Sequence, residues 1–451
     1  MKPTDALPHP ADWSTATISK TVEIKRGISW SKEQEHLAPR EGAIPVIRIG
    51  NVQERLELDD LIYISGLKPK AIEKKRVAAG WAIIVGSNGN RQRIGNAVKI
   101  VDDTDFLFAS FLIAAKPKPD SGITPEFFYR WLSSEQVQAY LSASSEGSTG
   151  LSNLSHSFFK AMAIPYPTTD EQAAIARILD AVDTTIEQTR EVIDFATKFK
   201  NTLVQDFFYS ALGLTAYADR PSKELPSDWV LLPMEALIAG EPKNGVSPKA
   251  SSQPPGTPTF SIAAIRDGRI DLFNGENLKY TEISPKVAEK FKISKGDILI
   301  VRGNANPDLV GKAGRITDFP DGCIYPDITK RVVLRNYGDH RLLPEFTVLT
   351  WNHAIVHNQV LRRAKTSNGT LKINNRDVKQ ILLPVPPLVQ QEEIVDLIEA
   401  VDTKIDALTA KFTALEQVKK SLMHDLLTGK VRVGDNFPEL IKVKSHASHR
   451  I

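Results

Sequence analysis

Cysteine is nearly absent from this sequence: Cys323 is the single one among 451 residues. An internal disulfide is therefore excluded, and such sparing use of cysteine is typical of a reducing compartment, so we expect a cytoplasmic protein. The sequence also has no run of about 18 apolar residues, and the polar, proline-rich residues 1–10 are unlike a signal peptide. The net charge of +3 neither requires nor excludes a nucleic-acid partner, so that argument depends on local clusters.

One stretch of the sequence occurs twice. Residues 165–207 return as residues 384–426, with 12 identities in 43 aligned positions and no gap. Chance would give about two or three, so the chain contains an internal duplication. The shared residues include a Pro-x-Pro step, Gln172 and Gln391, and an Ala-Val-Asp-Thr run at 181–184 and 400–403.

Each copy predicts one long helix. Apolar residues alternate at spacings of four and three, which is the period of a coiled-coil seam, with Lys200 and Lys419 as polar interruptions. Thr168 and Glu171 have the spacing of a capping box behind the prolines. We expect the helices to pair antiparallel; the alternative is two amphipathic helices packed separately on two globular cores. The expected seam comprises Ile175, Leu179, Val182, Ile186, Ile193, Leu203, Ile394, Ile398, Val401, Ile405, Leu408, Phe412, Leu415 and Leu422.

The segments that precede the two helices are also related. The block 296–313 matches 80–97 at 7 of 18 positions, and Asp228-Trp229 repeats Asp12-Trp13. Most other positions differ, as expected when one scaffold carries different loops. We therefore expect a mixed α/β (α+β) fold: two similar globular domains separated by two long helices that form an antiparallel coiled coil, with a pseudo-twofold axis. The expected boundaries are 1–164 and 213–383 for the domains, 165–212 and 384–432 for the helices, and 433–451 for a flexible tail. Within the first domain, 125–142 should form one helix.

A globular domain followed by a long helix behind a Pro-x-Pro step, and then both again, resembles the specificity (S) subunit of type I restriction–modification systems. The resemblance spans nearly the whole chain. Its most specific elements are residues 384–391 (PVPPLVQQ) with their duplicate, and the strand Gly-Asp-Ile-Leu-Ile at 296–300. Departures are mild: Trp81 stands where the second copy has Asp297, and the first proline step lacks the third proline and the leucine of the second.

The resemblance implies two target-recognition domains, each of which reads one half of a split DNA sequence. The helices would separate these domains and dock methyltransferase subunits. The implied partners are double-stranded DNA, two methyltransferase (modification) subunits and restriction/translocase subunits, with no membrane. This chain would be non-catalytic and hold no cofactor, while S-adenosylmethionine, Mg²⁺ and ATP would be bound by the partner subunits. The runner-up function is a two-module protein-binding scaffold without DNA specificity.

Basic and amide side chains in both halves are candidates for DNA contacts. Amide forks suit adenine and guanidinium forks suit guanine, whereas lysine clusters suit phosphates. The alternative is that asparagine and glycine shape turns and that basic runs are solvated faces. The candidates are Lys68, Lys70, Lys74, Lys75, Arg76, Ser87, Asn88, Asn90, Arg91, Gln92 and Arg93 in the first half, and Arg302, Asn304, Asn306, Lys312, Arg315, Lys330, Arg331, Arg362 and Arg363 in the second.

Signals for catalysis or metal binding are weak. Gly311-Lys312 lacks the earlier glycine and the following hydroxyl of a phosphate-binding loop. His353 and His357 have helical i, i+4 spacing but no third ligand, so a surface pair is expected rather than a metal site. We expect no catalytic residue and no metal ligand in this chain.

Overall fold

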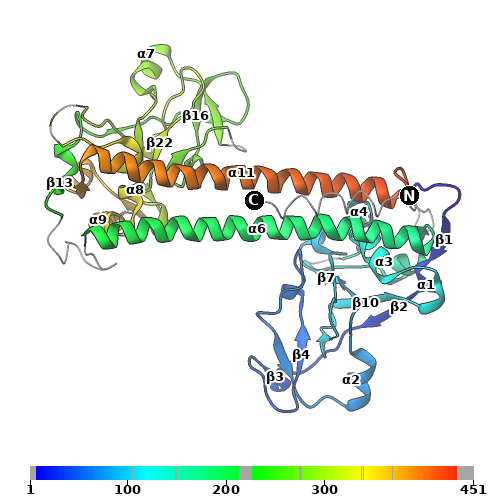
Figure 1. Ribbon diagram of the computed structural model, residues 1–451. Coiled ribbons are helices and arrows are strands. Elements are labelled where there is room, and N and C mark those ends of the chain that lie inside the picture. The colour runs from blue at the N-terminus through cyan, green and yellow to red at the C-terminus, as the bar shows by residue number, and fades with distance from the viewer. Residues whose placement is uncertain are drawn as a thin grey trace, which may run out of the picture. The chain divides into compact units, whose positions relative to one another are not determined.

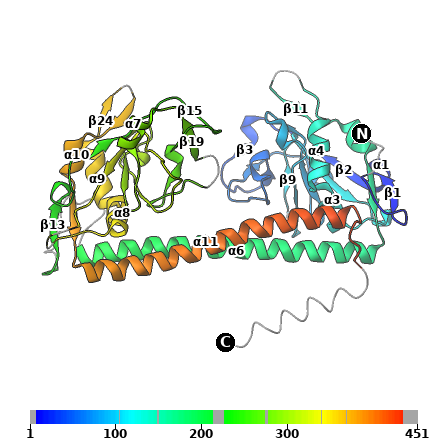
Figure 2. The same ribbon diagram turned by 90° about the horizontal axis from the view of Figure 1, so that it is seen from above.

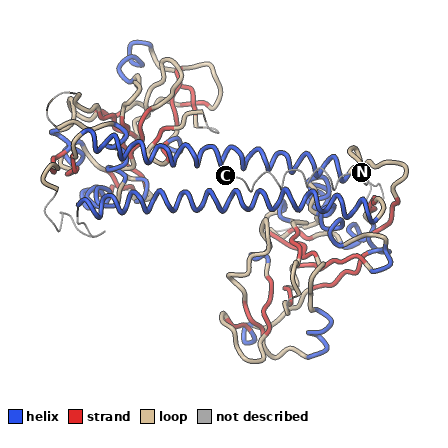
Figure 3. The backbone as a smooth tube through the Cα atoms, in the orientation of Figure 1, coloured by secondary structure: helices blue, strands red, loops and turns tan. Residues whose placement is uncertain are grey.

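The computed structural model describes residues 7–433 apart from 104, 148–149, 213–225, 274–276, 337, 339 and 368. The chain divides into two compact units, unit 1 (residues 1–191 and 410–451) and unit 2 (residues 192–409). Each unit contains one globular α/β domain and part of two long helices, α6 (Thr169–Leu212) and α11 (Leu388–Leu427) (Figures 1 and 3). Residues 213–225, at the start of the expected second domain, and nearly all of the predicted tail, 434–451, lie outside the described residues.

The globular domain of unit 1 is built on an antiparallel four-stranded sheet. Its order is β2 (Val22–Arg26), β10 (Leu112–Pro117), β6 (Ala82–Val85) and β8 (Ala97–Lys99). The four residues of β6 are Ala-Ile-Ile-Val and all are buried, so this strand takes a central place. A second sheet orders β3 (Glu35–His36), β5 (Ile62–Ile64), β4 (Ile44–Ile47) and β9 (Leu107–Phe108).

A helix packs on the first sheet, where it contacts β10 and β8. Phe127, Phe128 and Trp131 of α3 (Pro125–Leu132) are buried in the core of the domain. The predicted single helix at 125–142 is wrong: it is interrupted at Ser133 and Ser134, and α4 (Glu135–Ala143) follows. The hydroxyls of both serines donate to carbonyls of α3, which competes with the helical backbone bonds. The remaining elements are α1 (Ile18–Thr21), α2 (Pro69–Lys75), α5 (His156–Ala161), β7 (Ser87–Asn88) and β11 (Ser152–Asn153).

The globular domain of unit 2 repeats this plan with additions. Its main sheet orders β14 (Lys243–Asn244), β23 (Thr329–Val332), β20 (Ile298–Val301), β22 (Ala313–Ile316), β18 (Arg269–Ile270) and β17 (Ile265–Arg266). The smaller sheets are β15 (Ala250–Ser251), β19 (Leu278–Thr281) and β16 (Thr257–Phe260), and β21 (Gly303–Asn304), β25 (Thr370–Lys372) and β24 (Lys365–Ser367). Its helices are α7 (Pro285–Ala288), α8 (Pro344–Asn352), α9 (Ala354–Arg363) and α10 (Asn375–Lys379). Where unit 2 has the β17–β18 hairpin after the 3₁₀ turn Ile262–Ala264, unit 1 has an isolated bridge between Val52 and Leu56 after the 3₁₀ turn Ile49–Asn51.

A two-stranded pairing leads into each long helix. In unit 1, β1 (Ser14–Thr17) pairs with β12 (Ala163–Tyr166); in unit 2, β13 (Val230–Pro233) pairs with β26 (Leu382–Val385). The prolines of the duplicated step thus belong to a strand and the residues after it. The helices consequently begin at Thr169 and Leu388, four residues after the positions expected from the sequence.

The end of α11 belongs to the core of unit 1. Leu426, Leu427 and Val433 are buried in the same apolar cluster as Trp13. Arg432 forms ion pairs with Glu171 at 2.7 Å and with Asp12 at 2.9 Å. Glu171 therefore binds an arginine instead of closing the expected capping box, although its N–H does donate to Thr168 Oγ1 at 3.4 Å. No helix among the described residues is long and apolar enough to cross a membrane.

Candidate nucleic-acid interface

The polar turn after β6 has a duplicate after β20. Asn88 Oδ1 accepts a hydrogen bond from the N–H of Asn90 at 2.7 Å, and the same bond joins Asn304 and Asn306 at 2.9 Å. Asn90 and Asn306 each cap the following 3₁₀ turn with their own side-chain oxygen. The paired asparagines thus shape the turn in both domains, which accounts for their repetition without any contact to a base.

The two arginines of the first turn are engaged within their own domain. Arg91 Nε donates to the carbonyl of Ser142 at 3.0 Å, where it stabilises the end of α4. Arg93 Nη2 donates to the carbonyl of Val52 at 2.6 Å. Gln92 lies between them and is exposed, and Ser87 Oγ donates to Asn153. These bonds give both guanidinium groups a structural role, so Gln92 is the side chain of this turn most available to a ligand.

Several basic residues expected to contact DNA in the second domain are structural. Lys330 is 4% exposed and its ammonium donates to Asn244 and Asn375, so the expectation of a phosphate contact is corrected. Burial lowers the pKa of the Lys330 ammonium. Arg331 pairs with Asp297 at 2.9 Å. Arg302 and Lys312 are half-buried, Arg363 donates to the carbonyl of Gln359, and Arg362 is exposed.

Arg315 does not lie on the outer surface of the domain; its side chain faces the helices α8 and α11. Its guanidinium binds Glu345 of α8 at 2.6 Å and Glu399 of α11 at 2.8 Å, and its side chain is 14% exposed. In unit 1, Lys99 occupies the equivalent strand position and lies 3.8 Å from Glu126 of α3. Arg315 therefore attaches its domain to α11, and the expectation of base contact is corrected for this residue.

The basic helix α2 keeps its charges on the surface. Lys68, Lys70 and Lys74 are exposed, while Lys75 is half-buried and donates to the carbonyl of Arg26. Burial, together with the neighbouring charge of Lys74, lowers the pKa of Lys75. Arg76 pairs with Asp105 at 3.3 Å. Residues 68–76 contain five cations and one carboxylate, Glu73, so this segment favours an anionic ligand.

Within each unit, α6 and α11 are joined by an ion pair that the duplication repeats. Asp183 of α6 binds Lys419 of α11 at 2.8 Å in unit 1, and Lys200 of α6 binds Asp402 of α11 at 2.5 Å in unit 2. Asp183 and Asp402 are equivalent positions, as are Lys200 and Lys419. In unit 1 the aspartate is on α6 and the lysine on α11, whereas in unit 2 the lysine is on α6 and the aspartate on α11.

Further contacts in unit 1 follow the register of this ion pair. Arg190 lies seven residues after Asp183, and its guanidinium sits 5.2 Å from the ring of Phe412, seven residues before Lys419. Residue numbers that increase along α6 therefore meet residue numbers that decrease along α11, so the two helices run antiparallel in unit 1. The residues expected to form the seam are all buried or half-buried along both helices.

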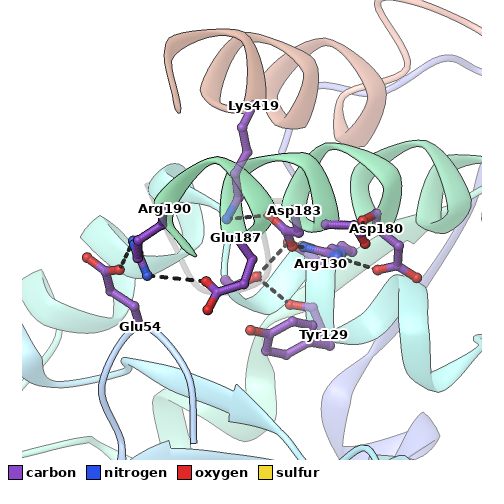
Figure 4. Close-up of polar contacts among 10 residues, drawn as sticks. Glu54, Tyr129, Arg130, Asp180, Asp183, Glu187, Arg190 and Lys419 are labelled. Atoms are coloured by element: carbon purple, nitrogen blue, oxygen red, sulfur yellow. Dashed lines mark hydrogen bonds and ion pairs between the residues drawn. The ribbon is translucent and has the colours of Figure 1, made fainter. Parts of the chain in front are cut away.

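A network of charges fastens α3 to these helices in unit 1 (Figure 4). The Arg130 guanidinium, with its side chain 7% exposed, bridges Asp180 and Asp183 of α6. Burial would raise the pKa of the Asp183 carboxyl, but Arg130 and Lys419 together hold it below its usual value. Nearby, Glu54 pairs with Arg190 at 2.8 Å and Arg55 pairs with Glu187, so residues 54–55 form a second attachment. A cleft of about 1500 Å³ lies between the two attachments.

The glutamine of the duplicated motif performs the same task in both units. Gln172 and Gln391 have no exposed surface. Each side-chain amide donates to two carbonyls and accepts from one backbone N–H, that of Thr124 in unit 1 and Leu343 in unit 2. The bonds link the start of each long helix to the residues that precede α3 or α8. The repetition of glutamine marked these positions in the sequence, but nothing there indicated which groups they would bind.

The histidine pair expected on the surface is partly buried. His353 is 8% exposed, caps α9 and stacks on Phe208 with ring centroids 4.6 Å apart. Burial lowers the pKa of His353 to about 4. His357 is half-buried. No group of three potential metal ligands occurs among the residues that the structure describes.

Comparison with known proteins identifies a family for both halves of the chain. A family model described as "Type I restriction modification DNA specificity domain" matches residues 10–194 and again 241–417. The type I restriction enzyme EcoKI specificity subunit of Escherichia coli K12 is 24% identical over 407 residues, covering 88% of this chain and 84% of that protein. The StySPI specificity subunit of Salmonella potsdam is 22% identical and covers 97% and 94%.

Solved structures share the fold. A type I restriction–modification S subunit from M. genitalium matches with a TM-score of 0.56 at 17% identity, covering 94% of this chain and 99% of that one. A chain from a structural study of complex assembly and conformational transition in the type I system matches with a TM-score of 0.52 at 15% identity, covering 94% and 100%.

Proposed function

Because the chain belongs to the type I restriction–modification DNA specificity family, we propose that it is the DNA sequence-recognition subunit of a type I restriction–modification complex. The observation that carries this proposal is the double match of the family model, once over each half of the chain. Each half has its own globular domain, and the two domains differ in most of their loop residues. We assign residues 1–164 and 213–383 to the two recognition domains, each of which reads one half of a bipartite, asymmetric target.

The long helices serve as the spacer between the half-sites. α6 has 44 residues, which corresponds to about 65 Å at 1.5 Å per residue. We propose that α6 and α11 form one antiparallel coiled coil. The repeated lysine–aspartate pairs and the low exposure of the seam positions in both units support this arrangement.

The same helices offer a surface for protein partners. Phe195 and Phe199 of α6 are 70% and 45% exposed, and their rings stack with centroids 6.4 Å apart. We propose that methyltransferase subunits dock on the outward faces of α6 and α11. Two such subunits would bring S-adenosylmethionine, while restriction/translocase subunits would use ATP and Mg²⁺. This chain would then be a non-catalytic, cytoplasmic subunit without a cofactor of its own.

Methylation mapping tests the proposed function. The chain would be produced together with its methyltransferase in a host without other adenine methylation, and modified adenines would be located by single-molecule sequencing. We expect two different short half-sites separated by a fixed number of unspecified base pairs. Absence of sequence-specific methylation, combined with protein capture that is independent of DNA, would instead indicate a protein-binding scaffold.

A further inference from the structure

The similarity between the two domains extends upstream of the buried strands β6 and β20. The segment at 69–80 matches 285–296 at the same offset of 216 that relates the strands. The matched pairs are Pro69 and Pro285, Lys70 and Lys286, Glu73 and Glu289, Lys74 and Lys290, and Gly80 and Gly296. Most other outward-facing positions of the two domains have diverged, so the retention of these charged residues needs a physical reason.

Backbone structure explains the first and last of these pairs. Both segments follow a strand of a small sheet, β5 or β19, and both begin a helical turn with proline at its first position. Both end at a glycine with φ of +84°, where a side chain would be strained. Proline and glycine are therefore retained because the two chains fold alike at this point.

Folding does not explain the retained lysines. All four lysine side chains are exposed, and none forms a hydrogen bond or an ion pair with a described residue. Lys70 and Lys74 lie one helical turn apart, so both ammonium groups project from one face of α2. Lys286 and Lys290 keep the spacing of four across α7 and the 3₁₀ turn that follows it.

A feature common to both domains must recognise something common to both halves of the target. The bases of the two half-sites differ, whereas the phosphate backbone is the same everywhere. The surroundings are positive as well, because residues 284–295 contain four lysines and one carboxylate, Glu289, which pairs with Lys292. We infer that Lys70 with Lys74, and Lys286 with Lys290, form one phosphate clamp in each recognition domain, which binds duplex DNA irrespective of its sequence.

This inference rests on the proposed function and adds the residues and the chemical group to it. A surface shared by both domains would also suit two identical methyltransferase subunits. The position of the lysines favours DNA: within each unit, α2 or α7 lies on the side of its domain away from the long helices (Figure 1), and Figure 2 shows the same for α7. An exposed lysine ammonium group that pairs with no described carboxylate can also neutralise a phosphate without first breaking an ion pair.

The test compares two double variants of the full chain, each assembled with its methyltransferase. One variant carries Lys74→Gln and Lys290→Gln. The control carries Lys32→Gln and Lys249→Gln, which removes the same charge from exposed positions, one in each domain, that the duplication does not retain. Binding to random-sequence duplex DNA and to the methylated target would be measured against salt concentration.

Loss of two phosphate contacts should reduce the slope of log K against log salt by about 1.8. The ratio of the wild-type affinity to the affinity of the clamp variant should consequently fall roughly tenfold as the salt concentration rises from about 50 to about 200 mM. The methylated sequence should stay the same, because no base contact is lost. In the control variant, the slope of log K against log salt should fall by less than half of the amount expected for the clamp variant.

Two results would overturn the clamp. An equal slope for wild type and clamp variant would show that these lysines do not contact phosphates. Loss of methyltransferase assembly at an unchanged slope would assign the surface to a protein partner. Failure of the proposed function is distinguishable from both, because the wild-type complex itself would then show no preferred DNA sequence.

Discussion

Replacing Gln391 with leucine tests whether the buried glutamines hold each domain to its long helix. The amide donates to the carbonyls of Arg341 and Pro386, both at 2.8 Å, and accepts from the N–H of Leu343 at 2.9 Å. Leucine has nearly the same volume, so the substitution removes hydrogen bonds without opening a large cavity. Arg341 is exposed and its carbonyl can bind water, which leaves two backbone groups without partners.

Each buried backbone group without a partner costs about 1–3 kcal/mol. We therefore expect Gln391→Leu, which leaves two such groups, to lower the stability of unit 2 by about 2–6 kcal/mol. Gln172→Leu should lower that of unit 1 by a similar amount, because its three bonds of 2.8–2.9 Å repeat those of Gln391. The matched control is Gln188→Leu, an exposed position of α6 that should change stability by less than about 0.5 kcal/mol.

Native-state hydrogen exchange is the appropriate assay, because a chain of two compact units has no single free energy of unfolding. Peptides from α8 report on unit 2 and peptides from α3 report on unit 1. Each glutamine variant should accelerate exchange through unfolding of its own unit. The assigned role of these amides would be refuted if both glutamine variants lowered the stability of their own unit by less than about 1 kcal/mol. A loss of stability no larger than that of the Gln188→Leu control would refute it as well.

Four further outcomes are expected. Lys200→Asp should lower the stability of unit 2 by about 3 kcal/mol, because it places a carboxylate next to Asp402 at a site where each side chain is 15% exposed. In a double-mutant cycle, adding Asp402→Lys should restore at least half of the lost stability. No recovery would contradict the ion pair. Burial holds the folded-state pKa of His353 at about 4, below its ordinary 6.5, so the folded state binds fewer protons and stability should fall by roughly 2–3 kcal/mol between about pH 7 and about pH 4. His353→Gln should flatten that dependence in hydrogen exchange of peptides from α8, which report on unit 2; an unchanged profile would assign the pH dependence to other groups. Ile405→Asp should weaken the helix pair by several kcal/mol, seen as lost methyltransferase binding in co-purification, whereas normal assembly would remove Ile405 from the seam. Exchange of residues 1–164 for those of a relative should alter one half of the methylated motif, and alteration of both halves would show that the domains do not read independently.

The architecture was predictable because the sequence contains the globular domain and the long helix twice. The seam spacing and the repeat at residues 165–207 predicted two long helices, and the shared strand block predicted two related α/β domains. The helix starts were placed four residues too early because a Pro-x-Pro step ends a strand as readily as it precedes a helix. The predicted coiled coil across the whole length of the helices stays a prediction.

The candidate interface was less predictable, since sequence does not show what a polar side chain binds. Arg91, Arg315 and Lys330 have the residue types expected of DNA contacts, yet each is engaged within its own unit. The seam residue Lys200 was recognised as an exception to the apolar pattern, but its partner follows only from the antiparallel register. The second basic segment at 284–295 was missed because its lysines are interspersed with apolar residues, although the offset of 216 would have located it.

Unit 1 draws its core from both ends of the chain. Trp13 packs in the same apolar cluster as Leu426, Leu427 and Val433, whereas unit 2 is one uninterrupted segment. A ribosome that adds about 5–20 residues per second needs roughly 10–40 s to translate the intervening residues 192–409. During that interval the apolar residues that pack against Leu426, Leu427 and Val433 lack these partners. The core of unit 1 can therefore be completed only after the whole of unit 2 has been translated.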